Sequence, residues 1–279
     1  MSFKPGAVLL LGFFYLLMMD GCAAFPSGNR YDQADRLAAA AGFQKSFLTT
    51  APFVLTSYER FRKAGDSISI YIEGDGNAWR SRTRISDDPT PGNPLVLELA
   101  ALDSAFNVAY LARPGQYAES RVPECDEDYW SGKRFSEEVV KAMNEAVNIL
   151  CRRAGAKDVH LIGYSGGAAI AVLIAARRDD IASLRTIAGN LYPEAVNRYH
   201  HVSQLNHSLN PMDVAGGLRN LPQRHFTGSK DDVVPSGVAE SFLLRAGFPD
   251  LRAMTVVENA SHSRGWSERW KELLDVSLY

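Results

Sequence analysis

DVHLIGYSGGAAIAVLIAAR, residues 158–177, joins the pattern of a buried strand to that of an apolar helix with no linker between them. The junction is Gly163-Tyr164-Ser165-Gly166-Gly167, with one glycine two positions before the serine and another two positions after it. Because glycine has no side chain, the strand and the helix can approach closely, and the serine is forced into a tight turn. We therefore expect Ser165 to stand at the carboxyl end of a central strand.

Predicted strands and helices alternate on both sides of this stretch. The alternation indicates an α/β fold with one mostly parallel, twisted sheet that is covered by helices on both faces. Strand patterns lie in 47–62, 67–74, 106–111, 158–164, 181–188, 223–227 and 253–258, and helix patterns in 31–41, 94–102, 136–155, 168–177, 236–246 and from 267 onward. The irregular segment 191–222 leaves room for a small cap or none.

The composition is typical of a single globular domain. Of the 279 residues, 46% are hydrophobic and 22% are charged, and no internal repeat or linker divides the sequence. We expect one domain over residues 45–279. The formal net charge of −2 gives no electrostatic basis for binding nucleic acid.

The N-terminal residues have the pattern of an export signal. Lys4 precedes the apolar run AVLLLGFFYLLMM, residues 7–19, which is too short to span a bilayer comfortably. Gly21-Cys22 follows and resembles the site at which bacterial lipoproteins are cleaved and lipidated on cysteine. The alternative is an ordinary secretory signal that is cut within 21–24.

The lipoprotein resemblance implies a bacterial, exported protein that a lipid attaches to a membrane. It predicts a signal peptide over 1–21, lipidation of Cys22, and a tether with a short helix over 22–44. The expected location is the cell envelope, facing the periplasm. The outer membrane is favoured because Ala23 does not read as a signal for retention in the inner membrane.

Two further cysteines, Cys125 and Cys151, leave two interpretations open. An even pair in an exported protein suggests a disulfide. The alternative is that Cys151 is a buried thiol on the apolar face of the 136–155 helix, since free cysteine packs as a small hydrophobe. No spacing of cysteines and histidines indicates a metal site.

Ser165 has candidate partners later in the chain. A serine hydroxyl needs a base to become a nucleophile, and the base needs an acid to orient it. Asp231 and Asp232 lie directly after one predicted strand, and His262 lies directly after the next. Because reactive groups gather beyond the carboxyl ends of parallel strands, we expect an acid and His262 to meet the serine. The alternative is an idle serine in a glycine-rich helix entry.

Backbone amides for a developing negative charge are expected from two turns. The amide of Gly166 lies at the start of the helix that follows the serine and points to where an oxyanion would form. Gly74-Asp75-Gly76 follows an earlier strand, and its glycines allow the backbone to turn sharply. We expect the amide of Asp75, or that of Gly76, to be the second donor; the alternative is a plain strand-ending turn.

These features together resemble the α/β-hydrolase superfamily over nearly all of 45–279. The hydrolase pattern Gly-x-x-Asp-x-x-Val-Pro, read from Gly228 to Pro235, places Asp231 in register and makes Asp232 its loop neighbour. Further stretches resemble poorly characterised exported hydrolases of bacteria, namely YIEGDGNAW, ARPGQY, YWSGKRFS, GYSGG and AGNL. Glu73 departs from the histidine that many esterases and lipases have at this place.

The resemblance implies a serine hydrolase that transfers an acyl group to water without a metal or organic cofactor. Carboxylic esters, either small molecules or lipids, are the expected substrates. A peptidase or thioesterase of the same fold is one alternative, and a non-catalytic binding module of the cell envelope is another.

Overall fold

A central sheet of eight strands organises this computed structural model, which describes Met1, residues 29–118 and residues 126–279. The strands are β1 (Gln44–Thr50), β2 (Phe53–Phe61), β3 (Ile68–Ile72), β4 (Asn107–Leu111), β5 (Val159–Tyr164), β6 (Ile181–Ile187), β7 (Gln223–Gly228) and β8 (Met254–Val257). Their order in the sheet is β1-β2-β4-β3-β5-β6-β7-β8. β2 pairs antiparallel with β1 and β4, and every other neighbouring pair is parallel.

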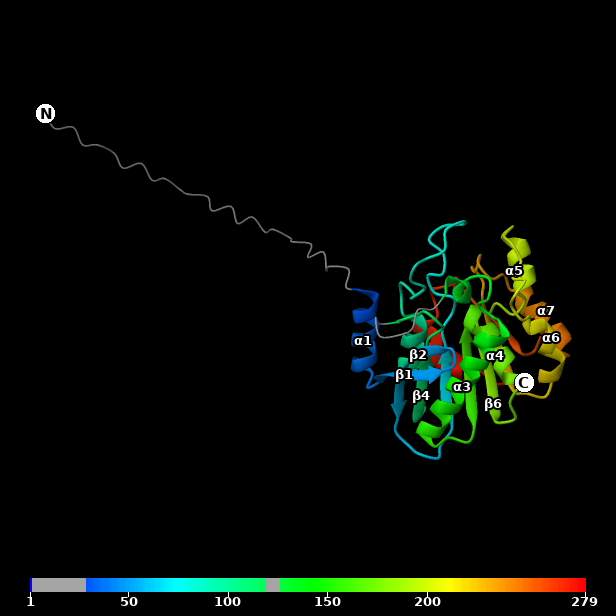
Figure 1. Ribbon diagram of the computed structural model, residues 1–279, viewed down its shortest axis with the longest axis horizontal. Helices are drawn as coiled ribbons and strands as arrows, with labels where there is room; N and C mark the ends of the chain where they lie inside the picture. The colour runs from blue at the N-terminus through cyan, green and yellow to red at the C-terminus, as the bar shows by residue number, and fades with distance from the viewer. Residues whose placement is uncertain (2–28, 119–125) are drawn as a thin grey trace.

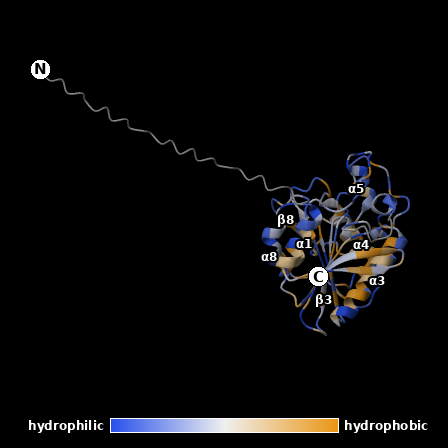
Figure 2. Ribbon diagram, turned by 60° about the vertical axis from the view of Figure 1, so that its left-hand side comes forward, coloured by the Kyte–Doolittle hydropathy of each residue, from blue (hydrophilic) through white to orange (hydrophobic). Residues whose placement is uncertain are grey.

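Helices cover both faces of this sheet, as predicted. One hydrophobic cluster joins the sheet to α3 (Glu137–Ala154), α4 (Gly166–Ala175) and α7 (Gly237–Ala246). The other cluster joins it to α1 (Arg30–Ala40), α2 (Leu95–Leu102) and α8 (Trp270–Leu274). Figure 2 shows the hydrophilic colours on outer helices such as α8 and in the surrounding loops. The expected mostly parallel sheet with helices on both faces is confirmed.

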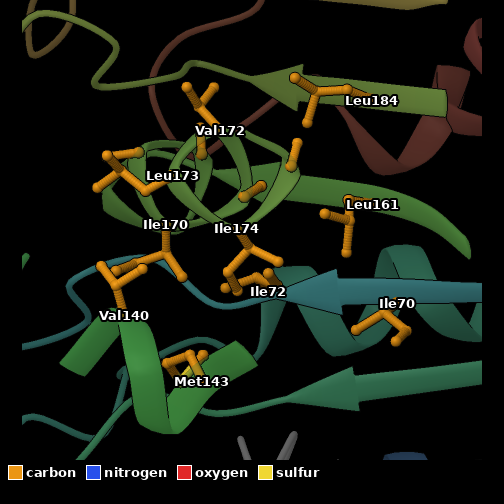
Figure 3. Close-up of a cluster of buried hydrophobic side chains, with 14 of the residues drawn as sticks. Ile70, Ile72, Val140, Met143, Leu161, Ile170, Val172, Leu173, Ile174 and Leu184 are labelled. Atoms are coloured by element: carbon orange, nitrogen blue, oxygen red, sulfur yellow. The ribbon is translucent and has the colours of Figure 1, made fainter. Parts of the chain in front are cut away.

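Helix α4, which begins directly after Ser165, is buried along its whole length. Each of its residues is buried, because it packs on β3 and β5 on one side and on α3 on the other. Figure 3 shows Ile170 and Ile174 of α4 beside Ile72 of β3, with Val140 and Met143 of α3 facing them. Burial of such a side chain contributes roughly 1.5–3 kcal/mol, so the start of α4 is fixed by packing.

The segment between β6 and β7 contains only short elements. They are α5 (Pro193–Tyr199), α6 (Pro211–Val214) and the 3₁₀ turn η2 (Ala215–Leu218). Two further 3₁₀ turns are η1 (Glu127–Trp130) and η3 (Ser267–Arg269). Figure 1 shows α5 rising at the end of the molecule where the parallel strands terminate, so the segment forms a small cap there.

Helix α1 packs on the domain. Ala34 and Ala38 are buried against the sheet, and Asp35 Oδ1 accepts a hydrogen bond from the Tyr58 hydroxyl at 2.6 Å. At its start, the Arg30 guanidinium donates to the Thr90 carbonyl oxygen at 2.7 Å. The helix that the sequence grouped with the tether therefore contributes to the core.

Several sequence predictions fall on residues outside the described ranges. The signal peptide over 1–21, Cys22 and Cys125 lie there and stay predictions. Cys151 is buried on α3, where burial raises the pKa of its thiol, and its pairing with Cys125 stays a prediction. Within the described parts, no helix has both the length and the apolar character needed to cross a membrane.

Candidate active site

Ser165 occupies a strained turn between β5 and α4. Its backbone has φ 50° and ψ −119°, a region that non-glycine residues rarely adopt. The flanking glycines make the turn possible: a β-carbon on Gly163 would lie 2.5 Å from the Ala168 α-carbon, and one on Gly167 would lie 2.3 Å from the Ile72 carbonyl oxygen. The serine therefore stands where the sequence placed it, at the carboxyl end of the central strand.

The structure brings Ser165, His262 and Asp231 into one hydrogen-bonded chain. His262 Nε2 lies 3.0 Å from Ser165 Oγ, and His262 Nδ1 lies 3.0 Å from Asp231 Oδ2. Both distances suit hydrogen bonds. Asp231 is fixed by two further bonds, because its Oδ1 accepts from the amides of Val233 and Val234 at 2.9 Å each.

The two neighbouring acids differ in burial and in contacts. The Asp231 side chain is fully buried, whereas Asp232 is exposed. Only Asp231 touches His262. The structure therefore distinguishes the two carboxylates, since Asp231 contacts His262 and Asp232 does not.

His262 is also held from its backbone side. Its carbonyl oxygen accepts hydrogen bonds from the Tyr164 hydroxyl at 3.0 Å and from Trp266 Nε1 at 3.1 Å. The Tyr164 ring lies beside the imidazole, with 5.3 Å between the ring centroids. Tyr164 precedes Ser165 in the chain, so one turn positions both the serine and the histidine. The sequence had not indicated this contact, because position 164 is the unspecified position of the glycine-serine pattern.

The turn after β3 meets the start of α4. A β-carbon on Gly166 would lie 2.0 Å from Asp75 Oδ1, so Asp75 and Gly166 are in direct contact. Gly166 is the first residue of α4, and the first amides of a helix have no acceptor within it. Gly76 has φ 60°, and a β-carbon there would lie 2.2 Å from the Pro89 carbonyl oxygen. The structure thus places the turn that carries Asp75 and Gly76 against the start of α4, and the role of its amides stays a prediction.

Two arginines that the sequence had not indicated hold the Asp75 carboxylate. Arg113 Nη1 lies 3.5 Å from Asp75 Oδ1, and Arg134 Nε lies 3.3 Å from Asp75 Oδ2. Burial lowers the pKa of Arg113 to about 10, so it keeps its charge near neutral pH. Arg113 also donates to the Arg134 carbonyl oxygen, which links the two arginines.

Glu73 is a buried carboxyl group directly before this turn. Its Oε1 accepts from the Gly74 amide at 2.8 Å, and its Oε2 accepts from the Tyr110 hydroxyl at 3.0 Å. Burial raises the pKa of Glu73 to about 7, against the opposing effect of these hydrogen bonds and of Arg113. Glu73 therefore changes charge near neutral pH.

Ser165 lies between two cavities of small-molecule size. The first, of about 480 Å³, has as its main lining residues Trp79, Arg82, Arg134, Val196, His200 and Leu205. The second, of about 400 Å³, has as its main lining residues Gly76, Asn77, Leu95, Tyr164, His262 and Ser263. We call them the arginine cavity and the histidine cavity. Ser165 and Asp75 line both.

Three of the five other histidines have structural partners. His225 is fully buried against Thr186, and burial lowers its pKa to about 3. His160 bonds Ser183, and burial lowers its pKa as well. His200 Nε2 bonds the Val233 carbonyl oxygen at 2.7 Å and so ties α5 to the loop that carries Asp231.

No cluster of three or more metal-ligating side chains occurs in the part of the chain that the structure describes. No family model and no curated protein matches this sequence. Solved structures do. An esterase of Pyrococcus furiosus superposes with a TM-score of 0.60 at 13% identity, covering 88% of this chain and 94% of the esterase.

Two other solved structures are similar at comparable levels. An alpha-beta serine hydrolase homologue from Coxiella burnetii gives a TM-score of 0.54 at 18% identity and covers 82% of this chain and 93% of its own. A puromycin-hydrolyzing peptidase of Mycobacterium tuberculosis gives 0.58 at 14% identity, covering 83% of this chain and 37% of the peptidase. Together with the strand order, these likenesses show that the chain has the α/β-hydrolase fold.

Proposed function

We propose that this protein is a serine hydrolase that forms an acyl-enzyme from carboxylic esters. The observation that carries the proposal is the hydrogen-bonded chain from Ser165 through His262 to Asp231, at a strained turn that begins helix α4. The fold supports it, since the esterase and the serine hydrolase homologue share the same architecture.

The geometry supports one order of steps. His262 Nε2 accepts the proton of Ser165 Oγ as that oxygen attacks the ester carbonyl carbon. The amides of Gly166 and Asp75, or Gly76 in its place, bind the negative oxygen that forms. Asp231 holds the proton on Nδ1 and stabilises the imidazolium. His262 then protonates the leaving alcohol, and water attacks the acyl-enzyme by the same route.

The shape of the site accommodates both halves of an ester. Each cavity has the volume of a small organic group, so one can receive the acyl part and the other the alcohol part. The similarity to a puromycin-hydrolyzing peptidase keeps amide hydrolysis as the second candidate.

A fluorescent fluorophosphonate tests for an activated serine. We expect the wild-type protein to be labelled and the Ser165→Ala variant to remain unlabelled. Turnover of 4-nitrophenyl acetate, compared with thioesters and peptide anilides, then separates the substrate classes. A folded wild-type protein that neither reacts with the probe nor hydrolyses any of these substrates would instead support a binding module.

We also propose that the protein is exported and lipidated on Cys22, which rests on the N-terminal sequence pattern. Cells fed a radiolabelled fatty acid should incorporate it into the wild-type protein and not into a Cys22→Ala variant. An unlabelled wild-type protein that is nevertheless shortened and exported would indicate an ordinary secretory signal.

A further inference from the structure

Arg134 carries a guanidinium group that lines the arginine cavity. Its Nε lies 3.3 Å from Asp75 Oδ2, and its guanidinium carbon lies over the Phe135 ring, 5.4 Å from the ring centre. Across residues 29–118 and 126–279, no acceptor forms a hydrogen bond with the side chain of Arg134, although the side chain is only 12% exposed and lines the arginine cavity. Asp75 pairs with Nε alone, which leaves the outer nitrogens of this guanidinium to donate to a ligand in the cavity.

Holding Asp75 does not account for Arg134. Arg113, which is 4% exposed, already forms an ion pair with the same carboxylate. Two guanidinium groups paired with one carboxylate have a net charge of +1. Among the lining residues of the arginine cavity, Arg82 adds a second cation and Asp75 is the single acid. The cavity wall beside Ser165 is therefore electropositive.

The rest of the arginine cavity has an apolar part beside polar side chains such as Asn190 and Asn197. Val196 and Leu205 come from the cap segment, Val234 comes from the loop after β7, and Trp79 comes from the loop after β3. This lining suits a short hydrocarbon body. An acyl chain with an anionic end would match both parts, with its carbons on the apolar wall and its charge on the guanidinium fork, which suits carboxylate and phosphate oxygens.

The position of His262 decides which half of an ester enters which cavity. His262 has to protonate the leaving alcohol, so the alcohol must lie on its side. His262 lines the histidine cavity and not the arginine cavity. The acyl half therefore belongs in the arginine cavity.

We infer that the enzyme prefers esters whose acyl group carries an anionic oxygen group, carboxylate or phosphate, bound by Arg134. This inference rests on the proposed function and names the substrate class of the same site. Arg134 is a specificity-determining residue in this view, and its charge distinguishes anionic from neutral acyl chains.

The test compares two esters of equal chain length, mono-4-nitrophenyl glutarate and 4-nitrophenyl pentanoate. The wild-type protein should show a kcat/KM about tenfold or more higher for the anionic ester, as expected for one charge-assisted hydrogen-bonded pair. Arg134→Gln should abolish this preference through KM, and Arg134→Lys should retain part of it. Arg80→Gln is the matched control, because Arg80 pairs with Asp87 and does not line the cavity.

Additional measurements show which half of the ester has to carry the anionic group, and whether that group is a carboxylate or a phosphate. With 3-carboxyphenyl butyrate and phenyl butyrate, where the charge is on the alcohol half, no preference is expected. Free glutarate and glycerol 3-phosphate, used as competitive inhibitors of 4-nitrophenyl acetate hydrolysis, distinguish a carboxylate from a phosphate. A preference confined to the alcohol half, or one that survives in Arg134→Gln, would overturn the inference, as would a wild-type preference for the neutral acyl chain.

Binding provides a readout that needs no turnover. By calorimetry, Ser165→Ala should bind monomethyl glutarate, and the double variant with Arg134→Gln should bind it at least about tenfold more weakly. Equal affinities would contradict the role of Arg134. Loss of fluorophosphonate labelling and of acetate hydrolysis in the wild-type protein would count against the proposed function instead, so the two failures can be told apart.

Discussion

Asp231 and Asp232 are adjacent in sequence, yet only one of them can orient the imidazole. The Asp231 carboxylate is buried and accepts from His262 Nδ1, whereas Asp232 faces solvent. We expect Asp231→Asn to lower kcat by about 10⁴-fold, because an amide does not hold the required tautomer or stabilise the imidazolium. Asp232→Asn, the matched control, should change kcat less than about twofold. Hydrolysis of a 4-nitrophenyl ester measures kcat for both variants. A large loss of kcat in Asp232→Asn with little loss in Asp231→Asn would show that Asp232 is the acid that orients His262.

Glu73 gives the stability of the protein a pH dependence of unusual sign for a carboxyl group. Its pKa is raised from 4.5 to about 7 by burial, so the folded protein holds a proton that the unfolded chain has released between these values. Stability is therefore lost as the pH rises from about 4.5 through about 7, by roughly 3 kcal/mol for this group.

Glu73→Gln removes this contribution of Glu73 to the pH dependence of stability. Relative to the wild type, the variant should gain up to about 3 kcal/mol of stability between pH 5 and pH 8. Urea denaturation at the two pH values measures the difference. The exposed Glu268 provides the control, since Glu268→Gln should follow the wild-type pH dependence. A parallel pH dependence for Glu73→Gln and the wild type would show that Glu73 does not titrate in this range.

Sequence order made Ser165 and His262 predictable, because each follows a strand whose carboxyl end had to face the same edge. The proximity of Asp75 to Gly166 was predictable for the same reason. Arg134 was not. It belongs to a loop without periodicity, and it reaches the site only because Arg113 and Asp75, from two other loops, fold against it. The spacing of these three residues in the sequence does not indicate that both arginines contact Asp75.

At the scale of single elements, the turn between β5 and α4 depends on glycine for steric reasons. A β-carbon at Gly163 would meet the backbone of the following helix at 2.5 Å, and the backbone cannot move without displacing the buried α4. Gly163→Ala should therefore destabilise the protein by about 3 kcal/mol or more.

Gly237→Ala is the control for this prediction. Gly237 is the first residue of α7, and nothing lies within 4 Å of a β-carbon there. Alanine at that place should leave stability unchanged or raise it by up to about 1 kcal/mol. Chemical denaturation compares the two variants. Similar stabilities for both would mean that the turn relaxes easily and that the close approach is not required.

Elements with local signals were predicted well, and elements stabilised by distant contacts were not. Ser136 caps α3 and Gly155 ends it in a left-handed conformation, at the places that the pattern indicated. The short helices α5 and α6 were not predicted within 191–222. They are too brief to show a helical period, and tertiary contacts hold them, such as that between His200 of the cap and Val233.

At the scale of the whole molecule, α1 sets how far the domain could lie from a lipid anchor. If Cys22 is lipidated, only the residues up to Asn29 separate the anchor from the start of α1. Seven residue steps of fully extended chain span at most about 25 Å. The sequence predicted a tether with a short helix over 22–44, and α1 is that helix, packed on the folded domain.

Removal of α1 tests this boundary. A protein that begins at residue 29 should be as stable as one that begins at residue 23, whereas one that begins at residue 43 should lose at least about 3 kcal/mol. The deletion uncovers the buried Tyr58 and removes the bond from Arg30 to the Thr90 carbonyl oxygen. Because Pro91 and Gly92, directly after Thr90, line the histidine cavity, activity should also fall before the protein unfolds. Thermal unfolding and ester hydrolysis are measured on the same preparations. Equal melting temperatures for all three proteins would show that α1 does not stabilise the domain and belongs with the tether.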